Sequence, residues 1–525
     1  MQNDPAAGSD QPSSYTPVID KRVTIISMGA VLSASFLLIV FPEGSARLAQ
    51  DAMRFITFQF GWLYLLTGVM PLLFAGWLAF GRFGSVKLGT ATEKPEYSTV
   101  SWVAMMFTAS MGASLIAWGF AEPIFYIQTP PLGAEVGSTR SIELAHLYPI
   151  FHWSLAPWAI YCLPSIPIAY MLYVRKGKSL RISDTCDAAL PESIRPRAKT
   201  VIDILVVISI VGGVATSIGF GVPLVSSLAV KLFGVPDNLL TQIVVILVWT
   251  VIFGISAYKG LKKGIKVLAD INIGLMFFLL AFILILGPTI YILNMSVNSI
   301  GLFIDNFARM SFWTDPIERS GFPEAWTVFY LAWWFAYAPM MGLFFARISR
   351  GRTIKQVVVG IIGLGSLGCF LFMSIAGAYV LYLQSENVID AIGIINGPGM
   401  STLVAEVIAQ LPAPTFILTV VTVLSVIFYA TTFDSAAYVL AGICTKNLPG
   451  DQEPGKINRV VWAGVLGIVA TGLMVADSLE TVKSMTVVTS LSAVPVLFMM
   501  CYTLHVWLKS DFPGLAKNKV HTLDS

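Results

Sequence analysis

Four aromatic residues lie at helical spacing in the segment 326–352, which is long enough to cross a membrane. Trp326, Tyr330, Trp333 and Tyr337 occupy positions i, i+4, i+7 and i+11, so a helix places them in one narrow stripe. Each ring has a negative π-face that attracts a cation and is compatible with an apolar interior. Quaternary ammonium ions suit such faces because they have no hydrogen-bond donors. The stripe therefore predicts the binding site of a transporter for onium compounds.

A second aromatic group lies in the segment 151–161. Trp153, Trp158 and Tyr161 share an arc of about 140° on a helix. Trp334 lies roughly 80° round its own helix from the first stripe. Rings from the two segments together could form a cage around one cation. The alternative left open is that these residues are ordinary core and interface aromatics.

The elements that must position these rings are membrane helices. The chain is 56% hydrophobic and 12% charged, with a mean hydropathy of +0.76. Apolar segments of about 20 residues, the length of a spanning helix, recur along it. We predict an all-α integral membrane protein with twelve transmembrane helices, at 23–41, 56–80, 100–127, 147–174, 200–232, 240–258, 267–295, 325–346, 357–385, 413–443, 460–477 and 485–508.

Basic residues predict the orientation of these helices. With a cytoplasmic N-terminus, most of the 33 lysine and arginine residues fall in cytoplasmic loops, as the positive-inside rule requires. Both termini are then cytoplasmic, and the protein lies in the cell inner (plasma) membrane with lipid around it. The net charge of +3 reflects this topology, so no nucleic-acid partner is implied. The basic residues on the outer side are Arg47, Arg54, Arg140, Lys231, Arg309, Arg319 and Lys483.

Catalytic and metal-binding motifs do not stand out in the sequence. The five cysteines form no C-x-x-C pair and the four histidines have no metal-ligand spacing. A membrane enzyme is therefore disfavoured, and we expect no cofactor. A channel is the other alternative from a different class, and it would show flux that does not saturate.

Two predicted spans contain residues that interrupt helices. The third carries 108–114 shortly after Trp102, and the eighth carries 337–342 shortly after Trp326. Broken helices at corresponding positions are typical of transporters built from inverted repeats. We predict two five-helix repeats, preceded by two accessory helices. The alternative is that glycine and proline are simply common in membrane helices. The predicted divisions are 21–99 for the accessory helices, 100–295 for the first repeat and 325–508 for the second.

Several motifs occur in an order that is specific to one family. From about residue 20 to its end, the chain resembles the betaine/choline/carnitine transporters (BCCT). The resemblance implies a LeuT-like secondary transporter, usually a homotrimer, that moves trimethylammonium or related onium substrates. The motifs are Trp326–Tyr330 with Ala332–Trp334, Ala346–Thr353, Gly119–Pro123, Tyr258–Lys266 and Phe433–Ser435.

The resemblance also assigns roles to individual residues. It implies an aromatic box of Trp153, Trp158, Tyr161 and Trp334, extended by Trp333 and Tyr337. It implies a sodium site formed by Thr108, Met111, Phe428, Thr431 and Thr432. It suggests a possible second sodium site at Thr216, Ser217 and Met340. For either hydroxyl of this second site, a bond to a carbonyl one helical turn earlier is the alternative.

The resemblance leaves two kinds of coupling open. The pair Asp434 and Ser435 is typical of the sodium symporters, and Asn272 stands where exchangers carry an arginine that replaces sodium. Met341, in contrast, aligns with an exchanger methionine. We expect sodium symport, with sodium-independent exchange of the carnitine type as the alternative.

Substrate specificity is expected to depend on the break in the third span and on Met341. Many family members carry Gly-x-Gly-x-Gly in the third span, whereas this chain has Ser110, Gly112 and Ser114, with Met111 between the first two. The added hydroxymethyl groups favour a compact or polar substrate. Betaine, choline, carnitine, dimethylsulfoniopropionate and trimethylamine N-oxide remain open.

The remaining segments carry secondary expectations. Residues 1–20 are expected to be a disordered cytoplasmic tail and 509–525 a short cytoplasmic one. Residues 296–324 are expected to form an outer amphipathic helix that resembles the family's trimer contact. The carboxylates of Glu122 and Asp434 are expected to have structural roles.

Overall fold

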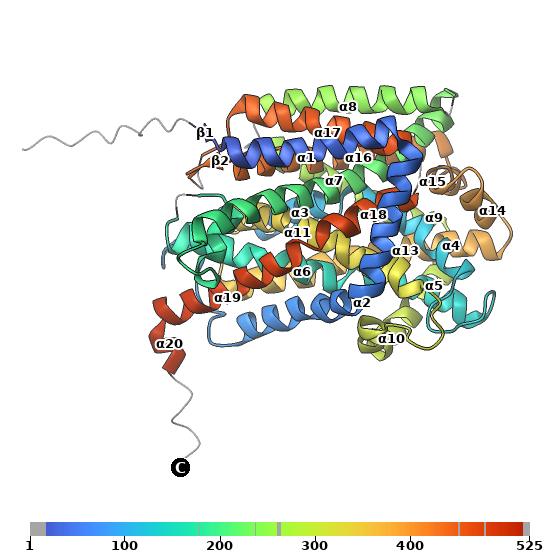
Figure 1. Cartoon of the computed structure of the whole chain (residues 1–525). Helices are drawn as coiled ribbons and strands as arrows, with labels where there is room; N and C mark the ends of the chain where they lie inside the picture. The colour runs from blue at the N-terminus through green and yellow to red at the C-terminus, as the bar shows by residue number, and fades with distance from the viewer. Residues whose placement is uncertain are drawn as a thin grey trace, which may run out of the picture.

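The computed structural model describes residues 17–177, 179–236, 238–259, 264–449, 452–476 and 479–517 (Figure 1). The α-helices are α1 (Lys21–Val40), α2 (Pro42–Phe80), α3 (Thr99–Ser110), α4 (Gly112–Gln128), α5 (Thr139–Trp153), α6 (Leu155–Ala169), α7 (Arg195–Phe233), α8 (Leu239–Lys259), α9 (Gly264–Leu286), α10 (Thr289–Phe312), α11 (Val328–Ile348), α12 (Ile354–Val358), α13 (Gly365–Ser385), α14 (Ala391–Asn396), α15 (Met400–Ala409), α16 (Pro414–Ile443), α17 (Lys456–Ala476), α18 (Leu479–Ser490), α19 (Ala493–Asp511) and α20 (Pro513–Lys517). π-Helical or 3₁₀ turns occur at η1 (Tyr170–Val174), η2 (Ile182–Ala189), η3 (Pro323–Thr327) and η4 (Val359–Leu364), and the strands are β1 (Val18–Ile19) and β2 (Thr445–Lys446).

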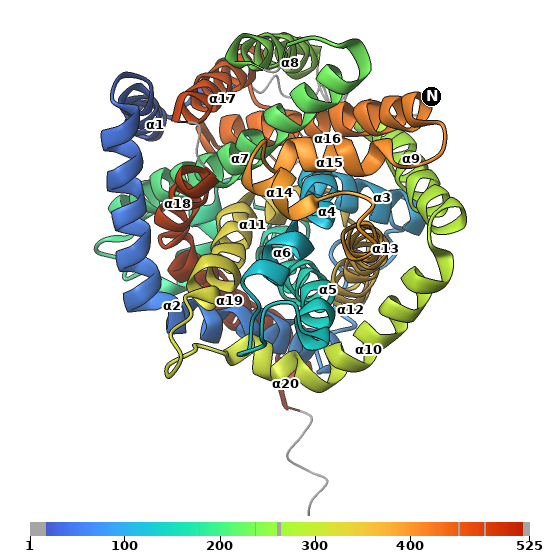
Figure 2. The same ribbon diagram turned by 90° about the vertical axis from the view of Figure 1, so that its right-hand side faces the viewer.

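The long helices run roughly alongside one another, and Figure 2 shows the bundle from one end. α6, α11 and α4 lie near its middle, and α1, α2, α8, α9 and α10 lie at its rim. Burial follows this order. In the most apolar part of the segment Pro323–Ile348, 94% of the residues are buried, whereas in that of Lys21–Val40 only 28% are buried. α1 begins and α19 ends at the same end of the bundle, on the left of Figure 1, which we call the terminal end. The helix that carries the aromatic stripe is therefore central.

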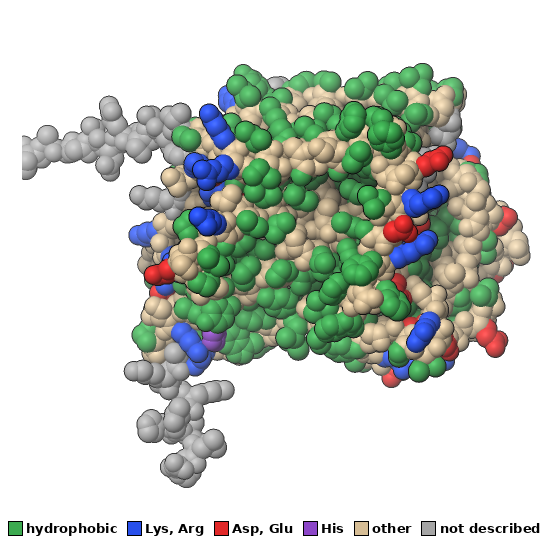
Figure 3. Space-filling model, viewed as in Figure 1, with side chains coloured by type: hydrophobic (Ala, Val, Ile, Leu, Met, Phe, Trp, Pro, Cys, Tyr) green, Lys and Arg blue, Asp and Glu red, His purple; other side chains and the backbone are tan. Residues whose placement is uncertain are grey.

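The surface is that of a membrane protein. Hydrophobic side chains cover the middle of the face in Figure 3, and charged side chains gather towards its two ends. Large apolar side chains such as Phe36, Phe58, Leu73 and Ile285 are exposed, as they are in proteins surrounded by lipid. Within the described residues, ten helices are long and apolar enough to span a membrane, or eleven with one bent pair. The all-helical membrane fold is confirmed, whereas the number of twelve spans stays a prediction.

The third predicted span is broken at the expected position. α3 ends at Ser110 and α4 begins at Gly112, and the segment 114–128 is inclined by 62° to α3. Gly112 has φ +44°, which a residue with a side chain adopts only with strain. The glycine therefore permits the change of direction.

The break expected at 337–342 is wrong, because α11 continues through this segment as one α-helix. Gly342 serves packing instead. A Cβ atom at this position would lie 2.5 Å from Cγ of Pro164, so the glycine lets α11 approach α6 closely. Pro339 lies inside the continuous helix.

Two predicted boundaries are also wrong. The span 267–295 ends early, because α9 stops at Leu286 and Pro288 caps α10, which starts at Thr289. Proline lacks the amide hydrogen needed to continue a helix. The amphipathic helix expected at 296–324 thus begins earlier and ends at Phe312. The span 147–174 likewise includes a break at Ser154, between α5 and α6.

The N-terminal segment is more ordered than expected. Residues 1–16 lie outside the described residues, but Val18 and Ile19 pair antiparallel with Lys446 and Thr445. The expectation of disorder is therefore wrong for the last residues before α1. Residues 518–525 and, within the motif Tyr258–Lys266, residues 260–263 also lie outside the described residues.

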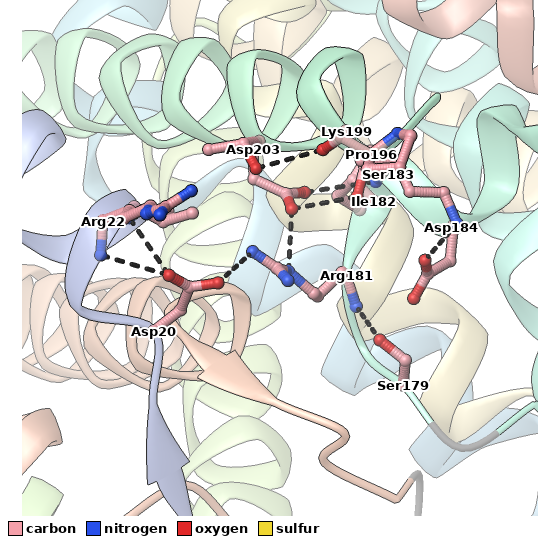
Figure 4. A network of polar contacts seen from close by, with 12 residues as sticks. Asp20, Arg22, Ser179, Arg181, Ile182, Ser183, Asp184, Pro196, Lys199 and Asp203 are labelled. Carbon is pink, nitrogen blue, oxygen red and sulfur yellow. Dashed lines mark hydrogen bonds and ion pairs between the residues drawn. The ribbon is translucent and has the colours of Figure 1, made fainter. Parts of the chain in front are cut away.

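A network of charges fixes the start of α1 at the terminal end (Figure 4). Arg181 donates to Asp20, before α1, at 2.9 Å, and its Nε lies 2.8 Å from the carboxylate of Asp203 on α7. The backbone amide and hydroxyl of Ser183 also donate to Asp203. Asp203 is fully buried, so these partners compensate its desolvation. The network joins α1, the segment at η2 and α7.

Replacing Arg181 by glutamine should destabilise the protein, because it leaves the buried Asp203 carboxylate without its guanidinium partner. Removing one member of a buried ion pair costs about 3 kcal/mol. Thermal unfolding of the detergent-purified protein measures the effect. The control is Arg54→Gln, since the pair of Arg54 with Asp51 is largely exposed. Equal melting temperatures for both variants would contradict the role of the network.

Candidate substrate and cation sites

The aromatic residues of the candidate box come from three helices in the centre of the bundle. α5 ends at Trp153, and after the single residue Ser154 the chain continues into α6, which carries Trp158 and Tyr161. Trp334 comes from α11, which packs along α6. All four rings are almost completely buried, with at most 2% exposed.

Three of these rings lie against one another. The ring centroids of Trp153 and Trp334 are 4.9 Å apart at an interplanar angle of 73°, and those of Tyr161 and Trp334 are 6.0 Å apart at 89°. The hydroxyl of Tyr161 has no hydrogen-bond partner among the described residues. Trp153, Trp334 and Tyr161 thus form a continuous aromatic wall, with one polar atom left available.

Trp158 lies to the side of this wall. It stacks between Phe107 on α3 and Phe345 on α11, at centroid distances of 5.9 and 6.4 Å. Its link to the other rings is Tyr161, at 6.4 Å. A Cβ atom on Gly365 would collide with the Trp158 indole, so the glycine makes room for it. The structure therefore brings three of the four predicted box residues together directly and connects the fourth through Tyr161.

Trp333 and Tyr337 extend the aromatic surface towards α7. The indole of Trp333 stacks on that of Trp334 at 5.1 Å and donates to the carbonyl of Gly213. The Tyr337 hydroxyl is hydrogen-bonded to that of Ser217 at 2.7 Å. Gly213 also accommodates the Tyr337 ring, since a Cβ atom there would lie 2.8 Å from it.

A buried carboxylate lies directly behind the aromatic wall. Oε2 of Glu122 accepts hydrogen bonds from the Trp153 indole at 2.9 Å and from the Tyr330 hydroxyl at 2.8 Å. Oε1 accepts from the Tyr126 hydroxyl at 2.6 Å, and Nδ1 of His152 lies 2.8 Å from it. Glu122 is fully buried, so these donors replace the water it has lost. We call Glu122 and its four donors the carboxylate hub.

The carboxylate hub was not among the predicted site residues. The signal for it was present, because a carboxylate inside a membrane segment is a candidate functional residue by default. Only the structure shows that Glu122 binds the box residue Trp153 and that His152 and Tyr330 belong to the same group. The hub joins α4, α5 and α11, and so fixes the wall relative to the broken helix.

The predicted sodium residues come from α16 and from the segment that ends at the break between α3 and α4. A Cβ atom on Gly112 would lie 3.1 Å from Oγ1 of Thr432, so the break lies directly against α16. The hydroxyls of Thr431 and Thr432 both donate to the carbonyl of Phe428, at 2.8 and 3.1 Å. The Thr108 hydroxyl donates to a carbonyl of its own helix. The hydroxyl hydrogen of each threonine is engaged in these bonds, whereas the lone pairs of its oxygen remain free to bind a cation.

The residues of the possible second sodium site have other partners. The Thr216 hydroxyl donates to the carbonyl of Gly212 and contacts the hydroxyl of Thr486 on α18. Ser217 binds Tyr337, and Met340 is fully buried in α11. The structure thus directs Thr216 towards α18 and Ser217 towards the aromatic surface.

The remaining predicted specificity residues are also buried. Met111 forms the break itself, Ser114 lies in the first turn of α4, and Met341 lies in α11.

Asn272 on α9 is fully buried, and neither its amide nor its carbonyl has a partner among the described residues. In the part of the chain that the structure describes, no group of three or more His, Cys, Asp or Glu side chains could hold a metal ion.

Comparison with known proteins identifies the family. Residues 22–513 match the family described as BCCT, betaine/carnitine/choline family transporter. The chain is 30% identical over 495 residues to a carnitine transporter of Acinetobacter baumannii, a match that covers 94% of this chain and 90% of that protein. It is 33% identical over 475 residues to the glycine betaine transporter OpuD of Bacillus subtilis, covering 90% and 91%. It is 34% identical over 447 residues to the uncharacterized transporter YeaV of Escherichia coli, covering 85% and 92%. The predicted resemblance is confirmed, and the chain belongs to the BCCT family of membrane transporters.

Proposed function

We propose that this transporter imports a small onium compound together with sodium, by alternating access through the aromatic wall. The observation that carries the proposal is the direct contact of Trp153, Trp334 and Tyr161 in the buried centre of the bundle. The names of two relatives, a carnitine transporter and a glycine betaine transporter, support this substrate class. Both compounds carry a trimethylammonium group.

Neutral rings suit a transported cation energetically. Each cation–π contact contributes about 0.5–2 kcal/mol when it is desolvated, so three or four rings support an affinity in the micromolar to millimolar range. A carboxylate in direct contact would be costly to desolvate and would hold the cation too firmly for release. The carboxylate hub avoids both the cost of desolvation and the slow release, because Glu122 lies behind Trp153 and binds its indole N–H.

We propose that Glu122 acts on the substrate through Trp153. The hydrogen bond at 2.9 Å fixes the orientation of the indole, and hydrogen-bonded groups in a low-dielectric interior polarise one another. An indole that donates to a carboxylate carries more electron density and attracts a cation more strongly. Glu122 is in this account a positioning residue that does not itself touch the substrate.

Sodium coupling is supported by the contact between the break and α16. Sodium prefers oxygen ligands, and Thr431 and Thr432 on α16 and Thr108 on α3 offer hydroxyl oxygens. The same break begins α4, which carries Glu122. An ion that holds Gly112 against Thr432 would therefore also stabilise the hub and the wall. This connection provides a physical route for coupling sodium to substrate.

We propose the family topology for the remaining features. The terminal end is cytoplasmic, in accordance with the positive-inside pattern, and α10 lies at the outer end. The segments 100–295 and 325–508 act as the two repeats that move relative to each other. Exposed apolar residues on α10, such as Ile300 and Ile304, suit contacts in a homotrimer.

Replacing Trp334 by leucine tests the aromatic wall. We expect uptake of onium compounds into proteoliposomes to fall roughly tenfold or more, because Trp334 contacts both Trp153 and Tyr161. The matched control is Trp62→Leu, since Trp62 lies on α2 with 57% of its surface exposed. Unchanged uptake by a correctly inserted Trp334 variant would refute the wall as the substrate site.

Replacing Thr432 by valine tests the sodium site. We expect the sodium concentration for half-maximal uptake to rise about tenfold, because the variant loses one oxygen ligand while its shape is kept. The control is Thr419→Val on the same helix, whose hydroxyl makes the same kind of bond to a carbonyl but is exposed. A sodium dependence equal to that of the wild type would argue against coupling at this site.

Glu122→Gln tests the carboxylate hub. One of the two acceptor oxygens becomes an amide donor that faces two donors, so we expect substrate affinity, measured by tryptophan fluorescence, to fall about tenfold. Glu143→Gln is the control, because Glu143 accepts only an exposed bond from Asn298 among the contacts described. If the Glu122 variant bound substrate as tightly as wild type, the hub would have only a structural role.

A further inference from the structure

Lys483 is a buried charge that the proposed transport mechanism does not use. It lies in the first half of α18, and only 1% of its surface is exposed. Its Nζ lies 4.4 Å from the ring centroid of Trp326 and 5.3 Å from that of Phe329. Lysine is almost never fully buried without partners, so its environment requires explanation.

The charge of Lys483 is only partly compensated. Its ion-pair partner is Glu480, at 3.2 Å, but 55% of the Glu480 side chain is exposed and water screens its charge. The buried carboxylate of Glu122 is already bound by four donors. The faces of Trp326 and Phe329 supply further stabilisation through cation–π contacts. A positive potential therefore remains in this region.

The region is continuous with the substrate wall. Phe329 stacks on Trp333 at 5.6 Å, and Trp333 stacks on Trp334 at 5.1 Å. Trp326 is the first residue of the aromatic stripe and lies about one helical turn before Phe329. Lys483 thus lies at one end of a row of rings whose other end is the wall. In the proposed orientation this end faces the outside, where substrate enters.

We propose that Lys483 selects substrates by net charge, favouring onium zwitterions over onium compounds that carry only the positive charge. A monocation that approaches Trp326 meets a like charge in a low-dielectric environment. A zwitterion has no net charge, and its anionic group is attracted by the ammonium. The inference rests on the proposed function and narrows its substrates to net-neutral compounds such as glycine betaine and carnitine.

A purely structural lysine would have a different signature. If Lys483 only fixed α18 to α11, its removal would weaken transport of all onium compounds in equal proportion. A charge filter changes the ratio between substrates that share the trimethylammonium group and differ in net charge. Choline and glycine betaine form such a pair, so their relative KM values separate the two roles.

The experiment measures uptake of both compounds into proteoliposomes by the full chain. Lys483→Met keeps an apolar side chain against Trp326 and removes the charge, and we expect the KM for choline relative to that for glycine betaine to fall about tenfold. Lys483→Arg keeps the charge and should leave the ratio near that of wild type. Glu480→Gln removes the exposed partner, so it should increase the discrimination against choline.

The outcomes distinguish this inference from the proposed function. A wild-type protein that transports neither of these two compounds nor carnitine or another onium compound would overturn the proposed function and, with it, the filter. Transport of glycine betaine with the same selectivity in all variants would overturn the filter alone. If Lys483→Met does not insert correctly, Lys483→Gln decides, because it removes the charge and keeps a polar group that can bond to Glu480; an unchanged choline to glycine betaine ratio in this variant would refute the filter.

Discussion

A carboxylate inside a membrane protein has no water to solvate it, and the requirement to replace that water organises the centre of this transporter. Glu122 obtains four donors from α4, α5 and α11. To supply them, Trp153, His152 and Tyr330 must adopt fixed positions, and α11 must lie beside the end of α5. One residue of the aromatic wall, Trp153, is thus held directly by the buried carboxylate, and Trp334 donates to the carbonyl of His152 beside it.

Continuous and broken helices then have different tasks. α11 is uninterrupted and holds its rings in fixed register, and Gly342 lets it approach α6. The break at Met111 and Gly112 brings the backbone of the third span directly against Thr432 on α16. Because α4 begins at this break and carries Glu122, the proposed ion site and the placement of Trp153 share one element. Lys483 is also a buried charge that has lost its water, and its ion-pair partner Glu480 is exposed. The aromatic faces of Trp326 and Phe329 therefore contribute to its stabilisation.

The sequence allowed the family and the membrane fold to be predicted, since they depend on composition, periodicity and motifs, and helical spacing also predicted which aromatic residues lie in the candidate site. It did not reveal that Glu122 binds Trp153, because their contact depends on how α4 and α5 pack. It also suggested a break at Pro339, where the neighbouring Gly342 serves packing with α6. Local residue type indicates that a helix can break, but tertiary contacts decide whether it does. The pairing of Val18 and Ile19 with β2 was hidden for the same reason.

The most direct test of the central claim is uptake of radiolabelled onium compounds into proteoliposomes that contain the wild-type protein, with an inward sodium gradient or with potassium in place of sodium. We expect saturable uptake that requires sodium. Sodium-independent uptake that requires preloaded substrate would contradict coupling at Thr431 and Thr432 and would indicate an exchanger. Flux that does not saturate would indicate a channel and would contradict the account as a whole.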